Sequence, residues 1–145
     1  MSRLGSYWLL FVIVAVGLAL SWGQVGRKTE RALQADPVVY LISETPCRPR
    51  SAPCAAAAGD RALVLGPAAQ GLALKQTGLQ PGDLLGAEVV FLDAAGSEVG
   101  RLSLRLDGQT WLLKAIPGEA RAVRVRLTGR AEVSVAEFPL HPTAD

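Results

Sequence analysis

Residues 101–127 read RLSLRLDGQTWLLKAIPGEARAVRVRL. In residues 101–106 every second residue is leucine, and in 123–127 apolar residues alternate with arginine. A period of two is typical of a β-strand with one buried side and one solvent-facing side. The dipeptides Asp107-Gly108 and Pro117-Gly118 supply turns between such strands. The stretch therefore predicts antiparallel strands joined by short loops.

Similar apolar runs, separated by turn residues, recur about every ten residues on both sides of this stretch. They predict a small all-β domain over residues 38–140, an antiparallel β-sandwich of jelly-roll-like type. We expect a flexible tail at 141–145, and residues 55–58 form a low-complexity alanine run. The expected strands are residues 38–43, 61–65, 72–76, 87–93, 98–106, 110–116, 120–127 and 131–138.

Three segments of this domain also resemble a known family. They are LQPGDLLGAEVVFLDAAGSEVG at 79–100, WLLKAIPGEARAVRVRL at 111–127 and VSVAEFPL at 133–140. Together they resemble the second half of galactose-binding-like jelly-roll modules of the carbohydrate-binding type. The resemblance implies the jelly-roll fold and concerns scaffold positions, among them Trp111. Glycan binding is an alternative function that it suggests.

The N-terminal part of the chain predicts a different element. Residues 4–26 are 23 residues without a charge between Arg3 and Arg27, and a helix of that length spans about 35 Å, enough for a bilayer core. We expect a single transmembrane helix at 4–26 acting as a signal anchor, after a short tail at 1–3 and before a helical stalk at 27–37. A cleaved signal peptide ending near Ser21-Trp22-Gly23 is the alternative. The expected membrane-interface anchors are Tyr7, Trp8 and Trp22.

Orientation and compartment follow from weaker signals. The positive charges at Arg27, Lys28 and Arg31 favour a cytoplasmic C-terminus, whereas the short N-terminal tail and the cysteine pair favour export. We expect export, with the N-terminus cytoplasmic. The 12 arginines against 3 lysines, with abundant Ala, Gly and Leu, indicate a GC-rich bacterial gene. The expected location is therefore the bacterial inner membrane, with the β domain in the periplasm.

Cys47 and Cys54 are the two cysteines of the chain. They enclose a short proline-containing loop, so we expect a structural disulfide. Thiol redox exchange and copper handling by the two sulfurs are the alternatives. We expect no zinc site, because two cysteines and the single histidine, His141, do not supply four ligands.

Charge and residue inventory limit the remaining functions. The net charge is +2, which lacks the basic excess of a nucleic-acid-binding protein. A catalytic triad would depend on His141 in the tail, so we expect no enzyme and no cofactor. A possible basic face, which would meet an acidic partner or lipid headgroups unless it is merely solvated, consists of Arg101, Arg105, Arg124 and Arg126.

Three small residues, Ala15, Ala19 and Gly23, recur every four positions in the N-terminal segment. This spacing gives a helix a smooth face for packing against a second helix, either of a membrane-protein partner or of another copy. The sequence thus predicts a non-enzymatic, membrane-anchored periplasmic protein that is an accessory or scaffold subunit of an envelope complex. The alternatives are the glycan-binding module and the thiol redox or metallochaperone protein.

Overall fold

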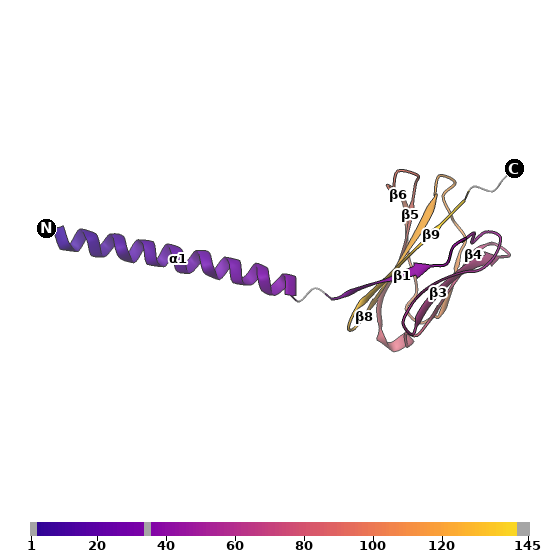
Figure 1. Cartoon of the computed structure of the whole chain (residues 1–145), viewed down its shortest axis with the longest axis horizontal. Coiled ribbons are helices and arrows are strands. Elements are labelled where there is room, and N and C mark those ends of the chain that lie inside the picture. The colour runs from indigo at the N-terminus through magenta and orange to yellow at the C-terminus, as the bar shows by residue number, and fades with distance from the viewer. Residues whose placement is uncertain (1–2, 34–35, 142–145) are drawn as a thin grey trace. The chain divides into compact units, whose positions relative to one another are not determined.

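The computed structural model of the chain describes residues 3–33 and 36–141. The chain divides into two compact units, Met1–Ala35 and Asp36–Asp145. The first contains one helix and the second contains the strands (Figure 1). Most of the expected tail, residues 142–145, lies outside the described residues, as do residues 1–2 and 34–35.

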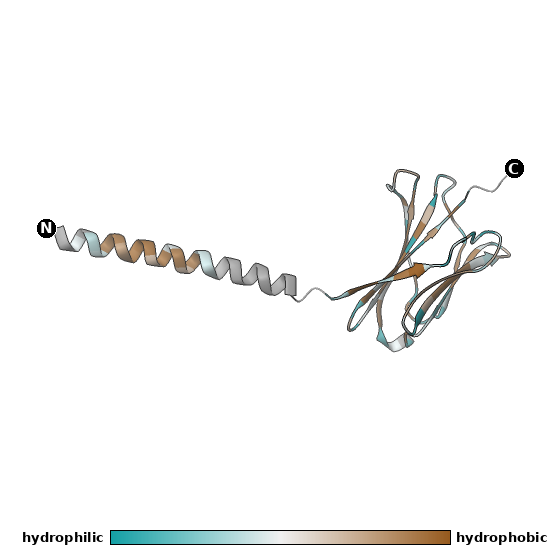
Figure 2. Ribbon diagram, in the orientation of Figure 1, coloured by the Kyte–Doolittle hydropathy of each residue, from teal (hydrophilic) through white to brown (hydrophobic). Residues whose placement is uncertain are grey.

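Helix α1 runs over Arg3–Leu33. Its described side chains form an unbroken series from Tyr7 to Trp22, are largely apolar (Figure 2), and are exposed on every side of the helix. The sequence of α1 is rich in leucine and alanine, which have high helix propensity, and it lacks proline.

The prediction of a transmembrane helix at 4–26 is wrong. Within the described residues, no helix is both long enough and apolar enough to cross a membrane. The fold class that combined such a span with the β domain is corrected accordingly.

The second unit is a mostly β domain. Its strands hydrogen-bond in the order β6-β5-β8-β9-β1-β2-β3-β4-β7. We call β6, β5, β8, β9 and residues 38–41 of β1 sheet A, and residues 42–43 of β1 with β2, β3, β4 and β7 sheet B. The strand bounds are β1 Val38–Ser43, β2 Cys54–Ala58, β3 Arg61–Ala68, β4 Gly71–Thr77, β5 Leu84–Leu92, β6 Glu98–Ser103, β7 Thr110–Leu113, β8 Ala122–Gly129 and β9 Val133–Pro139; the short 3-10 helix η1 covers Pro81–Asp83.

The pairing also corrects the predicted antiparallel, jelly-roll-like β-sandwich in one respect, because one pair of strands is parallel. Strand β1 runs parallel to β9, with Val38 opposite Val133, and antiparallel to β2, with Ile42 opposite Ala57. The other pairs are antiparallel, and β1-β2-β3-β4, β5-β6 and β8-β9 are neighbours in both sequence and sheet. Strand β2 was not expected, because its sequence is CAAAA.

One core lies between the two sheets. Alternate residues of β8 (Val123, Val125 and Leu127) point inward from sheet A, and Leu63 and Leu65 of β3 point inward from sheet B. All belong to a single buried cluster, and Figure 1 shows the two layers on either side of it. The core explains why the apolar alternation read from the sequence produces strands.

Cys47 and Cys54 form a disulfide with a Cα–Cα distance of 5.5 Å, which confirms that prediction. Both residues are buried. The bond joins the loop after β1 to the first residue of β2. Closing so short a loop stabilises the fold by about 2.5 kcal/mol in the chain-entropy account.

Candidate binding face

The outward side of sheet A carries rows of charged residues that adjacent strands place side by side. In one row Arg101 of β6 and Arg124 of β8 flank Val90 of β5, and Glu137 of β9 lies beyond Arg124. In the next row Glu88, Arg126 and Val135 follow one another, and Tyr40 of β1 ends the row. Each residue points outward because its neighbours in the strand fill the core.

Two of the three arginines on this side are held by carboxylates. Arg101 donates to Glu88 at 2.9 Å and to Glu98 at 2.7 Å. Arg124 donates to Glu137 at 3.0 Å. The hydrogen bond from Arg101 lowers the pKa of Glu98, and the same bond raises the pKa of Arg101. These pairs place glutamates beside Arg101 and Arg124 of the possible basic face.

Arg126 differs from both of these arginines. No carboxylate of the described residues forms an ion pair with it. It lines two shallow depressions, one of about 470 Å³ that also touches Tyr40, Val135 and Glu137, and one of about 350 Å³ bounded by Glu88 on the other side. Arg126 therefore stands between two hollows as an exposed cation.

An exposed apolar strip adjoins the first depression. It consists of Val38, Tyr40 and Ile42, alternate residues of β1 whose exposed fractions are 47%, 71% and 78%. We call these three residues the β1 strip. Its residues lie in two successive ladders, Val38–Leu41 with β9 and Ile42–Ser43 with β2, so backbone hydrogen bonds hold the strip where the chain passes from sheet A to sheet B.

The structure separates the remaining predicted residues. Arg105 lies in the loop after β6 and pairs with Asp107 at 3.1 Å, away from the rows that hold Arg101, Arg124 and Arg126. Trp111 is buried, and its indole N–H donates to the carbonyl oxygen of Arg105 at 2.7 Å. His141 is exposed after β9.

The predicted residues of the N-terminal segment belong to α1. Tyr7, Trp8 and Trp22 are exposed, as are Ala15 and Ala19. The surroundings of Gly23 lie outside the described side chains.

The β1 strip was missed as a site by the sequence analysis. The run VVYLIS is apolar at both odd and even positions, which is also the pattern of a strand buried on both sides. A tyrosine among aliphatic residues was the one available signal, because its hydroxyl favours a position with access to water.

A second polar cluster lies at one end of the two sheets. Arg61 of β3 pairs with Glu132 and donates to the buried hydroxyl of Ser134 at 3.2 Å. Gln76, also buried, hydrogen-bonds both backbone groups of Leu79. The polar groups of this cluster are hydrogen-bonded within the chain, and Arg61 connects β3 to Ser134 of β9. We therefore assign the cluster a structural role.

Among the described residues, no three His, Cys, Asp or Glu side chains lie close enough together to hold a metal ion. No family model, curated protein or solved structure matches this chain.

Proposed function

We propose that this chain is an exported, non-catalytic protein-binding module that docks a partner protein through the β1 strip. The observation that carries the proposal is the exposure of Tyr40 and Ile42, at 71% and 78%, on a strand whose backbone is held by β9 at Tyr40 and by β2 at Ile42. When a partner covers large apolar side chains, their removal from water lowers the free energy of the complex. Tyrosine and arginine together are also typical of the residues that dominate protein interfaces.

The chemistry of the face supports binding in preference to catalysis. Arg101, Arg124, Glu98 and Glu137 are engaged in ion pairs with one another or with Glu88. A general base needs a titratable group within reach of a substrate proton, and His141 lines none of the depressions described above. The face presents shallow depressions, exposed apolar side chains and charged groups, which are features that bind a partner protein.

Glycan binding is the weaker candidate for the same face. Sugars stack on exposed aromatic rings, but Trp111 is buried and its N–H is already bonded within the chain. Tyr40 alone remains as an exposed ring among the described residues of the β domain. The thiol alternative has less support, because Cys47 and Cys54 are buried and bonded to each other.

Site-specific photocrosslinking tests the docking proposal. A photoreactive phenylalanine analogue in place of Tyr40, in the full chain expressed in its own host, is expected to yield a discrete crosslinked protein. The matched control is the same analogue at Lys114, an exposed residue just after β7. Crosslinks at both positions, or at neither, would count against docking through the β1 strip, and Tyr40-dependent binding on a glycan array without a crosslinked protein would favour the glycan alternative.

Export is tested separately through the oxidation state of the cysteines. Disulfides persist in oxidising compartments. When cells are quenched in acid and the chain is alkylated, reduced and alkylated with a second reagent, Cys47 and Cys54 should carry the second reagent alone. The Cys47→Ser variant, whose Cys54 is free to react with the first reagent, is the control. Reaction of both wild-type thiols with the first reagent would contradict export.

A further inference from the structure

The outward side of sheet A holds three arginines and three glutamates in contact or in adjacent rows, so its formal charge is balanced. Yet the charges are not matched one to one. Glu88 and Glu98 both bind Arg101, and Glu137 binds Arg124. Arg126 is left without a carboxylate in the described part of the chain, while one arginine has two.

The register explains why Glu88 does not satisfy Arg126. Glu88 of β5 is the residue directly opposite Arg126 of β8, but it is also directly opposite Ser103 of β6, one row from Arg101. Its carboxylate Oε1 accepts from Arg101 at 2.9 Å. On the other side of Arg126 lies Val135, which offers no acceptor in its side chain. The Arg126 guanidinium therefore has N–H groups available to donate, and it lines the same depression as Val38 and Tyr40 of the β1 strip.

We propose that Arg126 receives a carboxylate side chain of the partner polypeptide, and that an apolar residue of the same segment covers Val38 and Tyr40. This inference rests on the proposed docking function and names the partner's chemistry: an acidic residue next to an aliphatic or aromatic one. A guanidinium binds a carboxylate with two parallel hydrogen bonds, which fixes the orientation of the bound segment.

The surrounding charges favour a single carboxylate over a more highly charged anion. Glu88 and Glu137 line the two depressions that Arg126 borders. They repel a phosphate or a lipid headgroup surface, whose several negative charges would meet one free cation. The neighbouring Val38, Val133 and Val135 provide apolar contact on the side of β1. The site therefore fits an amphipathic peptide segment best.

A peptide selection tests this inference on the full chain. A displayed library of random peptides is selected against the wild-type protein, and the recovered sequences are made synthetically. We expect peptides with one Asp or Glu beside Val, Leu, Ile or Phe, whose affinity falls about tenfold or more in Arg126→Glu, in keeping with a lost charge-assisted hydrogen bond. Replacing the peptide carboxylate by lysine should restore binding to Arg126→Glu and abolish binding to the wild type.

Controls separate the two proposals. Lys114→Glu makes the same charge change at an exposed position outside the face and should leave affinity unchanged, and circular dichroism checks that each variant is folded. Peptides that require Tyr40 but bind Arg126→Glu normally would overturn the carboxylate assignment and leave the docking function standing. Peptides indifferent to Tyr40→Ser, or a selection that yields no binders, would overturn both.

Discussion

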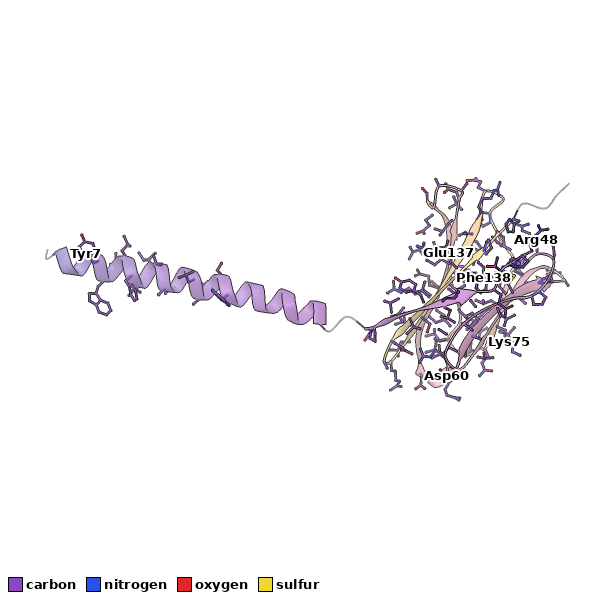
Figure 3. All side chains as sticks on the ribbon, viewed as in Figure 1. Tyr7, Arg48, Asp60, Lys75, Glu137 and Phe138 are labelled. Atoms are coloured by element: carbon purple, nitrogen blue, oxygen red, sulfur yellow. A yellow bond between two sulfur atoms is a disulfide. The ribbon has the colours of Figure 1, made fainter. Side chains whose placement is uncertain are left out.

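The outward sides of sheet A and sheet B differ in chemistry, although both include part of β1. Sheet A presents arginine and glutamate in ion pairs. Sheet B presents mostly apolar residues, with Thr77 and Thr110 as polar ones. Lys75 of β4, labelled in Figure 3, is the one charged residue that these ladders place on its outward side among the described residues. The outward residues of sheet B include Ala55, Ala57, Ala62, Val64, Ala73 and Leu112.

This difference shows that one buried core supports two kinds of surface. Inward residues are mostly apolar in both sheets because they fill the same cluster, and Gln76 and Ser134 are the buried polar exceptions among the described residues. Outward residues do not have to fit this core. The charged residues on sheet A and the alanines on sheet B are therefore not explained by core packing. The β1 strip, with its large apolar side chains, lies where the two surfaces meet.

The largest expected effect comes from placing the same charge on the two sides of β2. Ala56 is fully buried and Ala57 is exposed. An arginine at Ala56 buries an unpaired charge and overfills the core, so Ala56→Arg should lose about 4 kcal/mol or more and fail to fold. Ala57→Arg should change the free energy of unfolding by about 0.5 kcal/mol or less. Circular dichroism and denaturant titration of the full chain measure both; unfolding by Ala57→Arg would show that the outward side of sheet B is not free.

Removal of the disulfide should have the next largest effect. The bond tightens the loop that leads from β1 into sheet B. Cys47→Ser with Cys54→Ser should lower the free energy of unfolding by about 2–3 kcal/mol, measured by denaturant titration. Addition of a reductant should lower the stability of the wild type toward that of the double variant. Equal stability with and without the bond would contradict its assigned role as a staple.

Breaking an ion pair of sheet A should have a smaller effect. The side chains of Arg124 and Glu137 are about half exposed, at 49% and 50%, so solvent screens their attraction. Arg124→Gln should cost about 0.2–1 kcal/mol. Lys75→Gln on sheet B is the matched control, because no ion pair of Lys75 occurs among the described residues. An equal loss in both variants would mean that the charge network of sheet A adds nothing to stability.

The smallest expected effect is a pH dependence confined to sheet A. The hydrogen bond from Arg101 lowers the pKa of Glu98 in the folded chain, so the carboxylate stabilises the fold above the pKa of an unfolded glutamate, about 4.3. That contribution is lost as the pH falls through the lowered value. Wild type should exceed Glu98→Gln slightly in stability near neutral pH, and the two should converge in acid. A difference that grows in acid would reverse the assigned sign. The control is Glu119→Gln, because Glu119 is exposed in the turn before β8 and has no ion pair among the described residues.

The same difference between the sheets explains how far the fold was predictable. Strand β8 was recognised because outward arginines alternate with inward valine and leucine. Strand β6 was recognised from the alternation at 101–106, but it ends at Ser103, and Leu102 and Leu106 are exposed. Strand β2 was missed because Ala55 and Ala57 face outward as apolar residues, so CAAAA has no alternation to detect. The parallel pairing of β1 with β9 was also missed, since register between distant segments leaves no local pattern in the sequence.

The candidate site was predictable in part. Arg101, Arg124 and Arg126 were identified as outward residues, and the register brings them to one side of sheet A. Their pairing with Glu88, Glu98 and Glu137 depends on which strands are neighbours, as does the isolation of Arg126. The helix at the N-terminus shows the opposite error, because hydropathy alone led to a membrane span that the described residues do not support.

The position of β1 in the sheet order also affects how the domain forms. Val38 pairs with Val133, a residue 95 positions later in the chain. Until β9 has been synthesised, β8 lacks one neighbour and β1 has only its two-residue ladder with β2. Loop closure over such a distance is entropically unfavourable and slows folding. The domain is therefore completed last at its centre, and a chain that stops before β9 exposes the unpaired edges of β1 and β8 to other strands.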